Sequence, residues 1–237
     1  MILLKSNLLR KTAAEAIGTF VIVFAGCGSI AVNARFPLGL PAVGIPVVFG
    51  IAVMIMIYAL GHISGAHFNP AVTLAFAVAR HFSWNEVGFY WAGQFFGSFL
   101  AVAALRFLLP SGEIFGATIP FILPLQALGI ETLLTFILMF VIVSVATDTR
   151  AVGLMAGAAI GATVMLGAFL GGPLTGASMN PARSLAPNWI EGHLDVMWIY
   201  LAGPFLGTVC GALIYEWLRC DRTEKANRVH QEVKGCC

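Results

Sequence analysis

Two short polar motifs carry the residues of this chain best suited to chemistry. Asn69-Pro70-Ala71 and Asn180-Pro181-Ala182 each place an Asn before a Pro, and an apolar run follows each motif. Asn is a favoured N-cap, and Pro fits the first helical turn because its missing N–H would have no partner there. Each motif therefore predicts a helix start with N–H donors and a partial positive charge. Such a site can bind water or a hydroxylated solute and repel a cation.

Three ionisable residues lie in stretches that are otherwise apolar: Glu15, Glu131 and Arg183. An Arg at membrane depth must face a watery cavity or a partner, and pairing with backbone carbonyls is the structural alternative. The two Glu residues could form a proton relay. We favour a structural role, in which each carboxylate accepts N–H bonds from the irregular segment before a short helix, because such N–H groups need partners in lipid.

Long apolar spans are the elements that must position these residues. Of the 237 residues, 59% are hydrophobic and 10% are charged, whereas a soluble domain carries about a quarter charged residues. A membrane crossing needs about 20 helical residues. The stretches that meet this requirement are 12–32, 42–60, 86–109, 125–147, 152–170 and 196–218. Two shorter apolar pieces, 69–79 and 180–189, follow the second and fifth spans and must be re-entrant and buried in protein.

The sequence repeats itself with a period of about 111 residues, as residues 65–71 and 176–182 show. One Asn-Pro-Ala alone would be an ordinary turn or cap, but two copies at matching repeat positions argue against that interpretation. Each half holds three spans, an odd number, so the second half must lie inverted relative to the first. Inverted repeats with one interrupted segment in each half indicate a path at their interface, near the bilayer midplane.

We therefore predict an all-α membrane protein of six transmembrane helices and two re-entrant half-helices. A single channel domain would cover residues 1–218, with repeats at about 10–109 and 125–218, and a tail would follow at 219–237.

Lys and Arg residues indicate the orientation in the membrane. With six spans, one side holds ten positive residues: Lys5, Arg10, Lys11, Arg80, Arg150, Arg219, Arg222, Lys225, Arg228 and Lys234. The other side holds only Arg35 and Arg106 in its loops. The positive-inside rule then predicts cytoplasmic termini, in a plasma membrane or a bacterial inner membrane.

Several classes of function have no support in the sequence. The net charge is only +2, so a nucleic-acid partner has no electrostatic basis. No nucleophile–base pair or metal-ligand cluster falls at membrane depth, so we expect no enzyme activity, no cofactor and no metal. Cys27 and Cys210 are expected to be packing residues, while Cys236 and Cys237 end the tail and either carry lipid or lie in a disordered end.

The two motifs in their context resemble the double signature of the aquaporin (major intrinsic protein) family. Residues 61–73 and 176–184 carry this resemblance, which extends over about residues 10–218. Residues 53–58 and 147–151 look most like the nodulin-like intrinsic proteins of plants and their bacterial relatives. The resemblance implies a homotetramer of passive channels for water and small uncharged solutes, which exclude ions and protons. Glycerol and metalloid hydroxides, such as boric, silicic and arsenious acid, are associated with the subfamily.

The resemblance also places a selectivity filter at Phe49, Ala168, Ala177 and Arg183. Strict water channels usually have His where this chain has Ala168, and a larger residue where it has Ala177. Two alanines should widen the filter, which favours a solute larger than water beside water itself.

A ladder of backbone carbonyls is expected to line the rest of the path. We assign it to Gly65, Ala66 and His67 in one half and to Gly176, Ala177 and Ser178 in the other. His67 is either a pH gate or a neutral, hydrogen-bonded residue of the pore wall, and we favour the second interpretation.

Two alternative functions remain open. A strict water channel is favoured by Ser184, where glycerol channels usually have Asp. A secondary transporter could use the same inverted repeat. It would show saturable, ion-coupled uptake and place titratable residues at the midplane, where this chain offers Asn and backbone groups.

Overall fold

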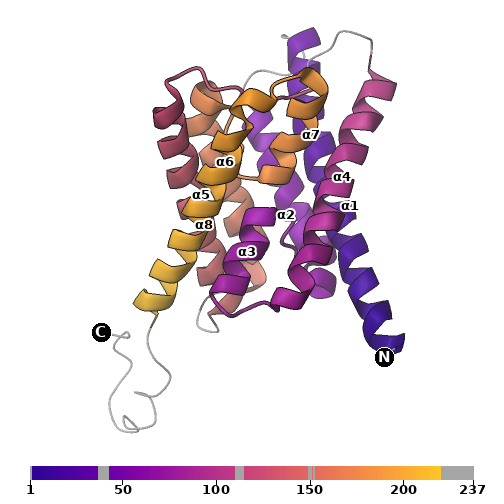
Figure 1. The fold of residues 1–237 in the computed structure, drawn as a ribbon, viewed down its shortest axis with the longest axis vertical. Coiled ribbons are helices and arrows are strands. Elements are labelled where there is room, and N and C mark those ends of the chain that lie inside the picture. The colour runs from indigo at the N-terminus through magenta and orange to yellow at the C-terminus, as the bar shows by residue number, and fades with distance from the viewer. Residues whose placement is uncertain (1, 37–42, 110–114, 149–150, 152, 220–237) are drawn as a thin grey trace, which may run out of the picture.

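The structure is a computed structural model that describes residues 2–36, 43–109, 115–148, 151 and 153–219, with side chains from residue 7 onward. The tail beyond residue 219, including Cys236 and Cys237, and Arg150 lie outside the described residues. The α-helices are α1 (Ile2–Arg35), α2 (Gly44–Ser64), α3 (Pro70–Val78), α4 (Trp84–Leu108), α5 (Pro124–Thr147), α6 (Ala156–Thr175), α7 (Pro181–Glu191) and α8 (Met197–Leu218) (Figure 1). Two single turns of 3-10 helix, η1 (Gly153–Met155) and η2 (Leu194–Val196), precede α6 and α8.

Six of these helices are long and apolar enough to cross a membrane, as predicted. They are α1, α2, α4, α5, α6 and α8. Their bounds lie close to the predicted spans except at α1, which begins at Ile2 rather than near residue 12. A hydropathy span ends where charged residues begin, whereas a helix can continue past the membrane surface. The predicted all-α membrane fold is therefore confirmed.

The two short helices, α3 and α7, begin at the prolines of the two Asn-Pro-Ala motifs. Asn69 caps α3 by accepting a hydrogen bond from Ala71 N at 2.9 Å. Asn180 caps α7 by accepting one from Ala182 N at 3.0 Å. In Figure 1, α3 occupies the lower half of the bundle and α7 the upper half, so that the two helix starts meet near its middle.

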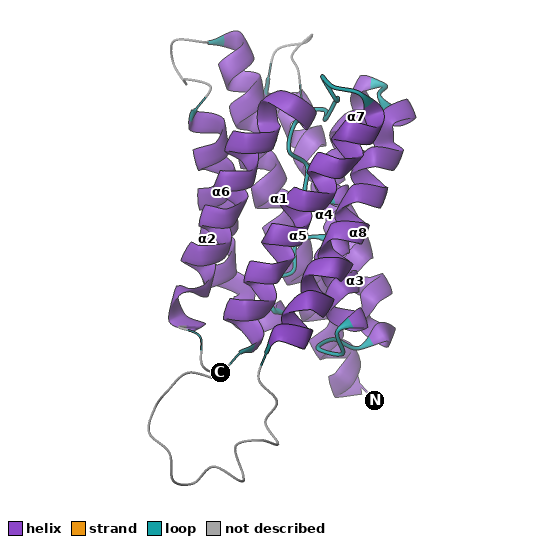
Figure 2. Cartoon of the chain, turned by 90° about the vertical axis from the view of Figure 1, so that its left-hand side faces the viewer, coloured by secondary structure: helices purple, strands orange, loops and turns teal. Residues whose placement is uncertain are grey.

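The helix pairs follow the internal symmetry of the sequence. In the first half α1 packs along α4, and in the second half α5 packs along α8. Each short helix also packs on a long helix of the other half, α3 on α8 and α7 on α4, and α2 packs on α6 (Figure 2). The described halves therefore share one interface, and the two helix starts lie along it.

Glycines at matching positions let these helices approach closely. A Cβ atom added at Gly97 of α4 would collide with the backbone of Ala16 in α1. A Cβ atom added at Gly207 of α8 would collide with the carbonyl of Thr132 in α5. Small residues at crossings are what helix packing in a membrane requires.

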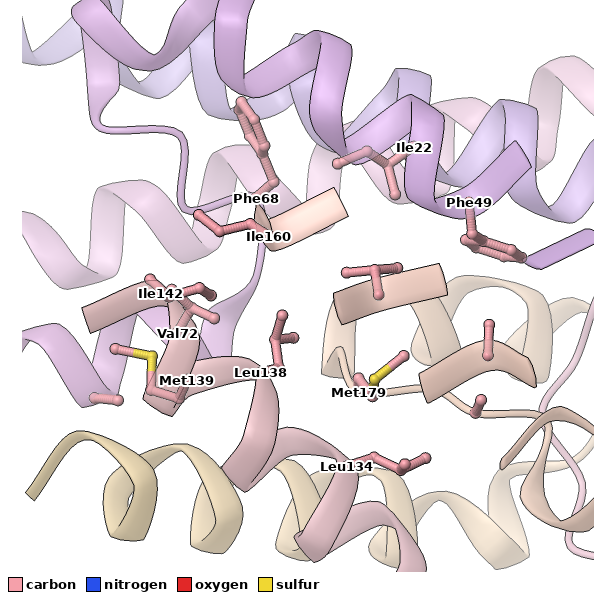
Figure 3. Packing of buried hydrophobic residues seen from close by; sticks show 14 of the residues in the cluster. Ile22, Phe49, Phe68, Val72, Leu134, Leu138, Met139, Ile142, Ile160 and Met179 are labelled. Atoms are coloured by element: carbon pink, nitrogen blue, oxygen red, sulfur yellow. The ribbon is translucent and has the colours of Figure 1, made fainter. Parts of the chain in front are cut away.

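Buried hydrophobic side chains surround the place where the two halves meet (Figure 3). The residues just before the two capping Asn residues are Phe68 and Met179, which are 2% and 3% exposed. The ring of Phe68 packs against Gly18 of α1, and the thioether of Met179 packs against Gly167 of α6. Just before each short helix, a large apolar side chain thus holds the chain in place by packing against a glycine of a long helix.

Candidate functional site

Two irregular segments, residues 65–68 and 176–179, connect α2 to α3 and α6 to α7. Each begins with a glycine in the left-handed region, Gly65 at φ +87° and Gly176 at φ +80°. Within these two segments, four non-glycine residues also have positive φ: Ala66, Phe68, Ala177 and Met179. Such a backbone costs on the order of 1–3 kcal/mol per residue and persists only when the surroundings hold it. The two segments therefore need strong partners at the same positions.

Glu15, which is fully buried in α1, holds the first segment. Its Oε1 atom accepts hydrogen bonds from Ser64 Oγ at 2.7 Å and from His67 N at 3.0 Å. Its Oε2 atom accepts from Phe68 N at 2.6 Å and from Gln94 Nε2 at 2.7 Å. One carboxylate thus satisfies two backbone N–H groups that would otherwise be unpaired in a membrane interior.

Glu131, which is fully buried in α5, holds the second segment in the same way. Its Oε1 atom accepts from Thr175 Oγ1 at 2.6 Å and from Ser178 N at 3.0 Å. Its Oε2 atom accepts from Met179 N at 2.9 Å. Both Glu residues therefore make the contacts of a structural carboxylate, the role that we favour over a proton relay.

The two capping Asn residues also tie the halves together. Asn69 Nδ2 donates to the carbonyl of Met179 at 2.7 Å, and Asn180 Nδ2 donates to the carbonyl of Phe68 at 2.9 Å. An amide nitrogen carries two hydrogens. Each Asn thus uses one N–H within the protein and retains a second one.

A cavity of about 120 Å³ runs past both Asn residues. A buried water needs about 10–15 Å³ by the same measure, so this cavity has room for several waters. At one end its wall includes Phe49, Ala168 and Arg183, and at the other end it includes Ile57 and Ala156. Between these ends lie the two irregular segments. The cavity is therefore a path along the interface of the two halves.

The cavity is lined by all four residues that the family resemblance places in a selectivity filter. Phe49, Ala168, Ala177 and Arg183 all line it, although they come from α2, α6, the second irregular segment and α7. The Arg183 Cζ atom lies 5.1 Å from the centroid of the Phe49 ring, within the range of a cation–π contact. The Phe49 ring in turn packs against Gly26 of α1, which fixes its position.

Most of the carbonyl-ladder residues also line the cavity: Gly65, Ala66, His67, Ala177 and Ser178. Gly176 is not among the lining residues, and a Cβ atom added to it would lie 3.2 Å from Thr118 Cγ2. His67 Nδ1 lies 3.1 Å from Thr73 Oγ1, and its ring stacks on Phe76 with centroids 4.7 Å apart. A pH gate is not required to explain this packed histidine.

Arg183 is 2% exposed, and among the described residues its guanidinium makes one hydrogen bond. Its Nη1 atom donates to the carbonyl of Gly116 at 2.7 Å. Within the described residues its Nε atom has no hydrogen-bond partner. A buried N–H without a partner is rare in proteins, so Arg183 carries a polar group that the described residues satisfy only in part.

Several residues that support the site were not predicted from the sequence. Ser64 and Thr175 each lie five positions before a capping Asn, and the internal repeat could have revealed this pair. Tyr90 and Tyr200 donate to the carbonyls of these two residues, at 2.6 and 2.7 Å. The contact of Arg183 with Gly116 has no counterpart in the repeat, so no pattern in the sequence indicated it.

A water-sized path between two capped helix starts, inside six apolar helices, defines a membrane channel. Within the described ranges, no three His, Cys, Asp or Glu side chains gather closely enough to hold a metal ion. Residues 3–215 match the model of the family described as "Major intrinsic protein". The chain belongs to the major intrinsic protein family, and its curated relatives include nodulin-like members.

Two curated relatives and one solved structure illustrate the similarity. The chain is 48% identical over 212 residues to "Aquaporin NIP1-1" of Oryza sativa subsp. japonica, covering 89% of this chain and 75% of that protein. It is also 48% identical over 212 residues to "Nodulin-26" of Glycine max, covering 89% and 78%. The solved aquaglyceroporin from Plasmodium falciparum is 25% identical, with a TM-score of 0.80 over 88% of this chain and 96% of that one. The protein is a channel for water and small solutes, and it is not an enzyme.

Proposed function

We propose that this channel conducts water together with small uncharged hydroxylated solutes, of the size of glycerol and of boric, silicic or arsenious acid. The observation that carries the proposal is the composition of the narrow outer wall. Two of its four side chains, Ala168 and Ala177, are single methyl groups. The other two supply an aromatic face, from Phe49, and a hydrogen-bond donor, from Arg183. Such a wall suits a solute with an apolar edge and hydroxyl groups.

Exclusion of cations and protons is the second part of the proposal. The positive ends of α3 and α7 point at the middle of the path, and each helix start carries about half a positive charge. The guanidinium of Arg183 adds a full charge at the outer end. A cation would meet both barriers without compensation from acidic side chains, because the described residues that line the cavity include neither Asp nor Glu.

The relatives support a solute range beyond water. The similar solved structure is named an aquaglyceroporin. Ser184, the residue that favours a strict water channel in the sequence, is fully buried and bonds to Ser178 and Thr118. It does not line the cavity, so its identity bears on solute size only indirectly.

We also propose a homotetramer with one pore per subunit, in a plasma membrane or a bacterial inner membrane, with cytoplasmic termini. The tetramer rests on the family resemblance. The orientation rests on the distribution of Lys and Arg in the sequence.

Flux measurements on purified protein in liposomes test this function. We expect glycerol and boric acid uptake to rise linearly with concentration and to be independent of sodium or proton gradients. A pH-sensitive dye inside the vesicles should report a proton leak no faster than that of empty liposomes. Saturable uptake that follows an ion gradient would instead indicate a transporter.

A further inference from the structure

The outer loop segment 115–118 lies against one face of α7. Three side chains of that face, at Ser184, Asn188 and Glu191, bind it. Their spacing of four and three residues places them in a row along the helix. The same segment contains Gly116, whose carbonyl binds Arg183. The loop is therefore fixed by α7 immediately beside the filter.

Asn188 and Ser184 hold the far end of the segment. Asn188 Oδ1 accepts from Thr118 N at 2.8 Å, and Asn188 Nδ2 donates to the carbonyl of Thr118 at 2.9 Å. Thr118 Oγ1 donates to Ser184 Oγ at 2.7 Å. These bonds anchor the backbone at Thr118 but do not reach the peptide group that contacts Arg183.

Glu191 holds that peptide group directly. Its Oε1 atom accepts hydrogen bonds from Phe115 N and from Ala117 N, both at 2.9 Å. The N–H of Ala117 and the C=O of Gly116 belong to one planar trans peptide, so they point in opposite directions. When the carboxylate fixes the N–H, it also fixes the direction of the carbonyl that accepts from Arg183 Nη1 at 2.7 Å.

Two further features favour a single position of the Gly116 carbonyl and strengthen its contact with Arg183. Gly116 has φ +86°, and a Cβ atom added there would lie 3.0 Å from Cys27 Sγ, so the loop is packed against α1. A carboxylate that binds the N–H of a peptide also polarises it, which makes its carbonyl a better acceptor for a guanidinium. Glu191 therefore orients the 116–117 peptide, and this peptide in turn orients the Arg183 guanidinium.

We propose that Glu191 is a positioning residue, which sets the place of the Arg183 guanidinium in the filter through the peptide between Gly116 and Ala117. The proposal rests on the proposed filter role of Arg183. With alanines at 168 and 177, the Phe49 ring is the one other large side chain of the filter, and it contacts the guanidinium at 5.1 Å. Loss of the Gly116 contact would let the guanidinium leave its place and change solute selection.

The test compares variants of the full-length channel in liposomes by their glycerol-to-water permeability ratio and by proton leak. In Glu191→Ala we expect the ratio to change by about threefold to tenfold, the scale of one typical hydrogen bond, because the 116–117 peptide loses its acceptor. Glu191→Gln retains an Oε1 acceptor and should rescue the ratio. Glu191→Asp keeps the charge but shortens the side chain, so it should resemble Glu191→Ala. Thr118→Val, which removes loop bonds away from the 116–117 peptide, is the matched control.

Double variants separate this inference from the filter proposal. If Glu191 acts through Arg183, adding Glu191→Ala to Arg183→Ala should change the ratio no further. A wild-type ratio in Glu191→Ala, or equal changes in Glu191→Ala and Thr118→Val, would overturn the positioning role. Should Glu191→Ala fail to fold, the Gln and Asp variants decide, and equal behaviour of these two overturns it. A wild-type ratio in Arg183→Ala would overturn the filter proposal itself.

Discussion

At the scale of single residues, two small side chains determine the width of the proposed filter. Ala168 and Ala177 are 9% and 7% exposed, and each leaves space that a longer side chain would fill. Phe49 and Arg183 occupy the remaining sides and contact each other. Solute size should therefore respond to one added side chain at either alanine.

We predict that Ala168→His makes the channel more selective for water over glycerol. An imidazole at this position would project into the cavity, because Ala168 lines it. Glycerol permeability should fall about tenfold, the scale on which a pocket discriminates by size, while water permeability falls much less. Stopped-flow light scattering on liposomes measures both quantities.

The same substitution at Ala162 is the control for this prediction. Ala162 lies on the exposed side of α6 and outside the cavity wall. Equal loss of glycerol flux in both variants would show that a histidine in α6 acts through folding rather than through the filter.

At the scale of elements, the structure depends on two buried carboxylates and on close helix crossings. The irregular segments 65–68 and 176–179 share the same alternation of positive φ values, and each has its own carboxylate, Glu15 or Glu131. This correspondence explains how two backbone segments without regular secondary structure can lie at membrane depth.

Glu15→Ala should destabilise the fold strongly. It leaves His67 N and Phe68 N without their acceptor, at about 1–3 kcal/mol for each unpaired group. We expect a clearly lower thermal midpoint in detergent and reduced water permeability. Glu86→Ala is the comparison, because its ion pair with Lys11 lies at the end of the bundle and is worth about 0–1 kcal/mol. Similar midpoints for the two variants would contradict the role of Glu15.

A pair of glycine substitutions in α4 tests the helix crossings. Gly97→Ala would place a methyl group against the backbone of Ala16, so α1 and α4 would have to separate. An atom added at Gly88 of the same helix meets nothing within 4 Å. We predict a lower thermal midpoint for Gly97→Ala and an unchanged or higher one for Gly88→Ala, since Ala favours a helix by about 1 kcal/mol. Equal thermal midpoints for the two variants would contradict this prediction.

At the scale of the whole molecule, the start of α1 and the end of α8 lie at the same end of the bundle (Figure 1). Ion pairs and polar contacts gather there, including Lys11–Glu86 and the contact of His81 with Glu216 at 2.8 Å. From the Lys and Arg count we propose that this end is the cytoplasmic one. We predict that epitope tags fused to either terminus are digested by protease in inside-out vesicles and protected in intact cells. A tag digested on intact cells would reverse the orientation.

The sequence predicts the fold well because a membrane leaves few options for an apolar chain. Helix spans, half-helices and inverted symmetry all follow from hydropathy, Asn-Pro caps and the repeat of residues 65–71 at 176–182. The filter residues came from family resemblance, since nothing in their spacing brings Phe49 beside Arg183. The contacts of Gly116 and Glu191 could not be predicted, because they join a loop to a helix over 67 to 76 residues without a repeat partner.

The most direct test of the central claim is a two-phase stopped-flow measurement on liposomes that contain the wild-type channel. An outside glycerol gradient is applied, and light scattering follows water efflux and then glycerol entry. We predict fast shrinkage followed by fast re-swelling, with a low activation energy for both phases. Fast shrinkage without re-swelling would contradict the account, because it would mean that the filter formed by Phe49, Ala168, Ala177 and Arg183 admits water alone.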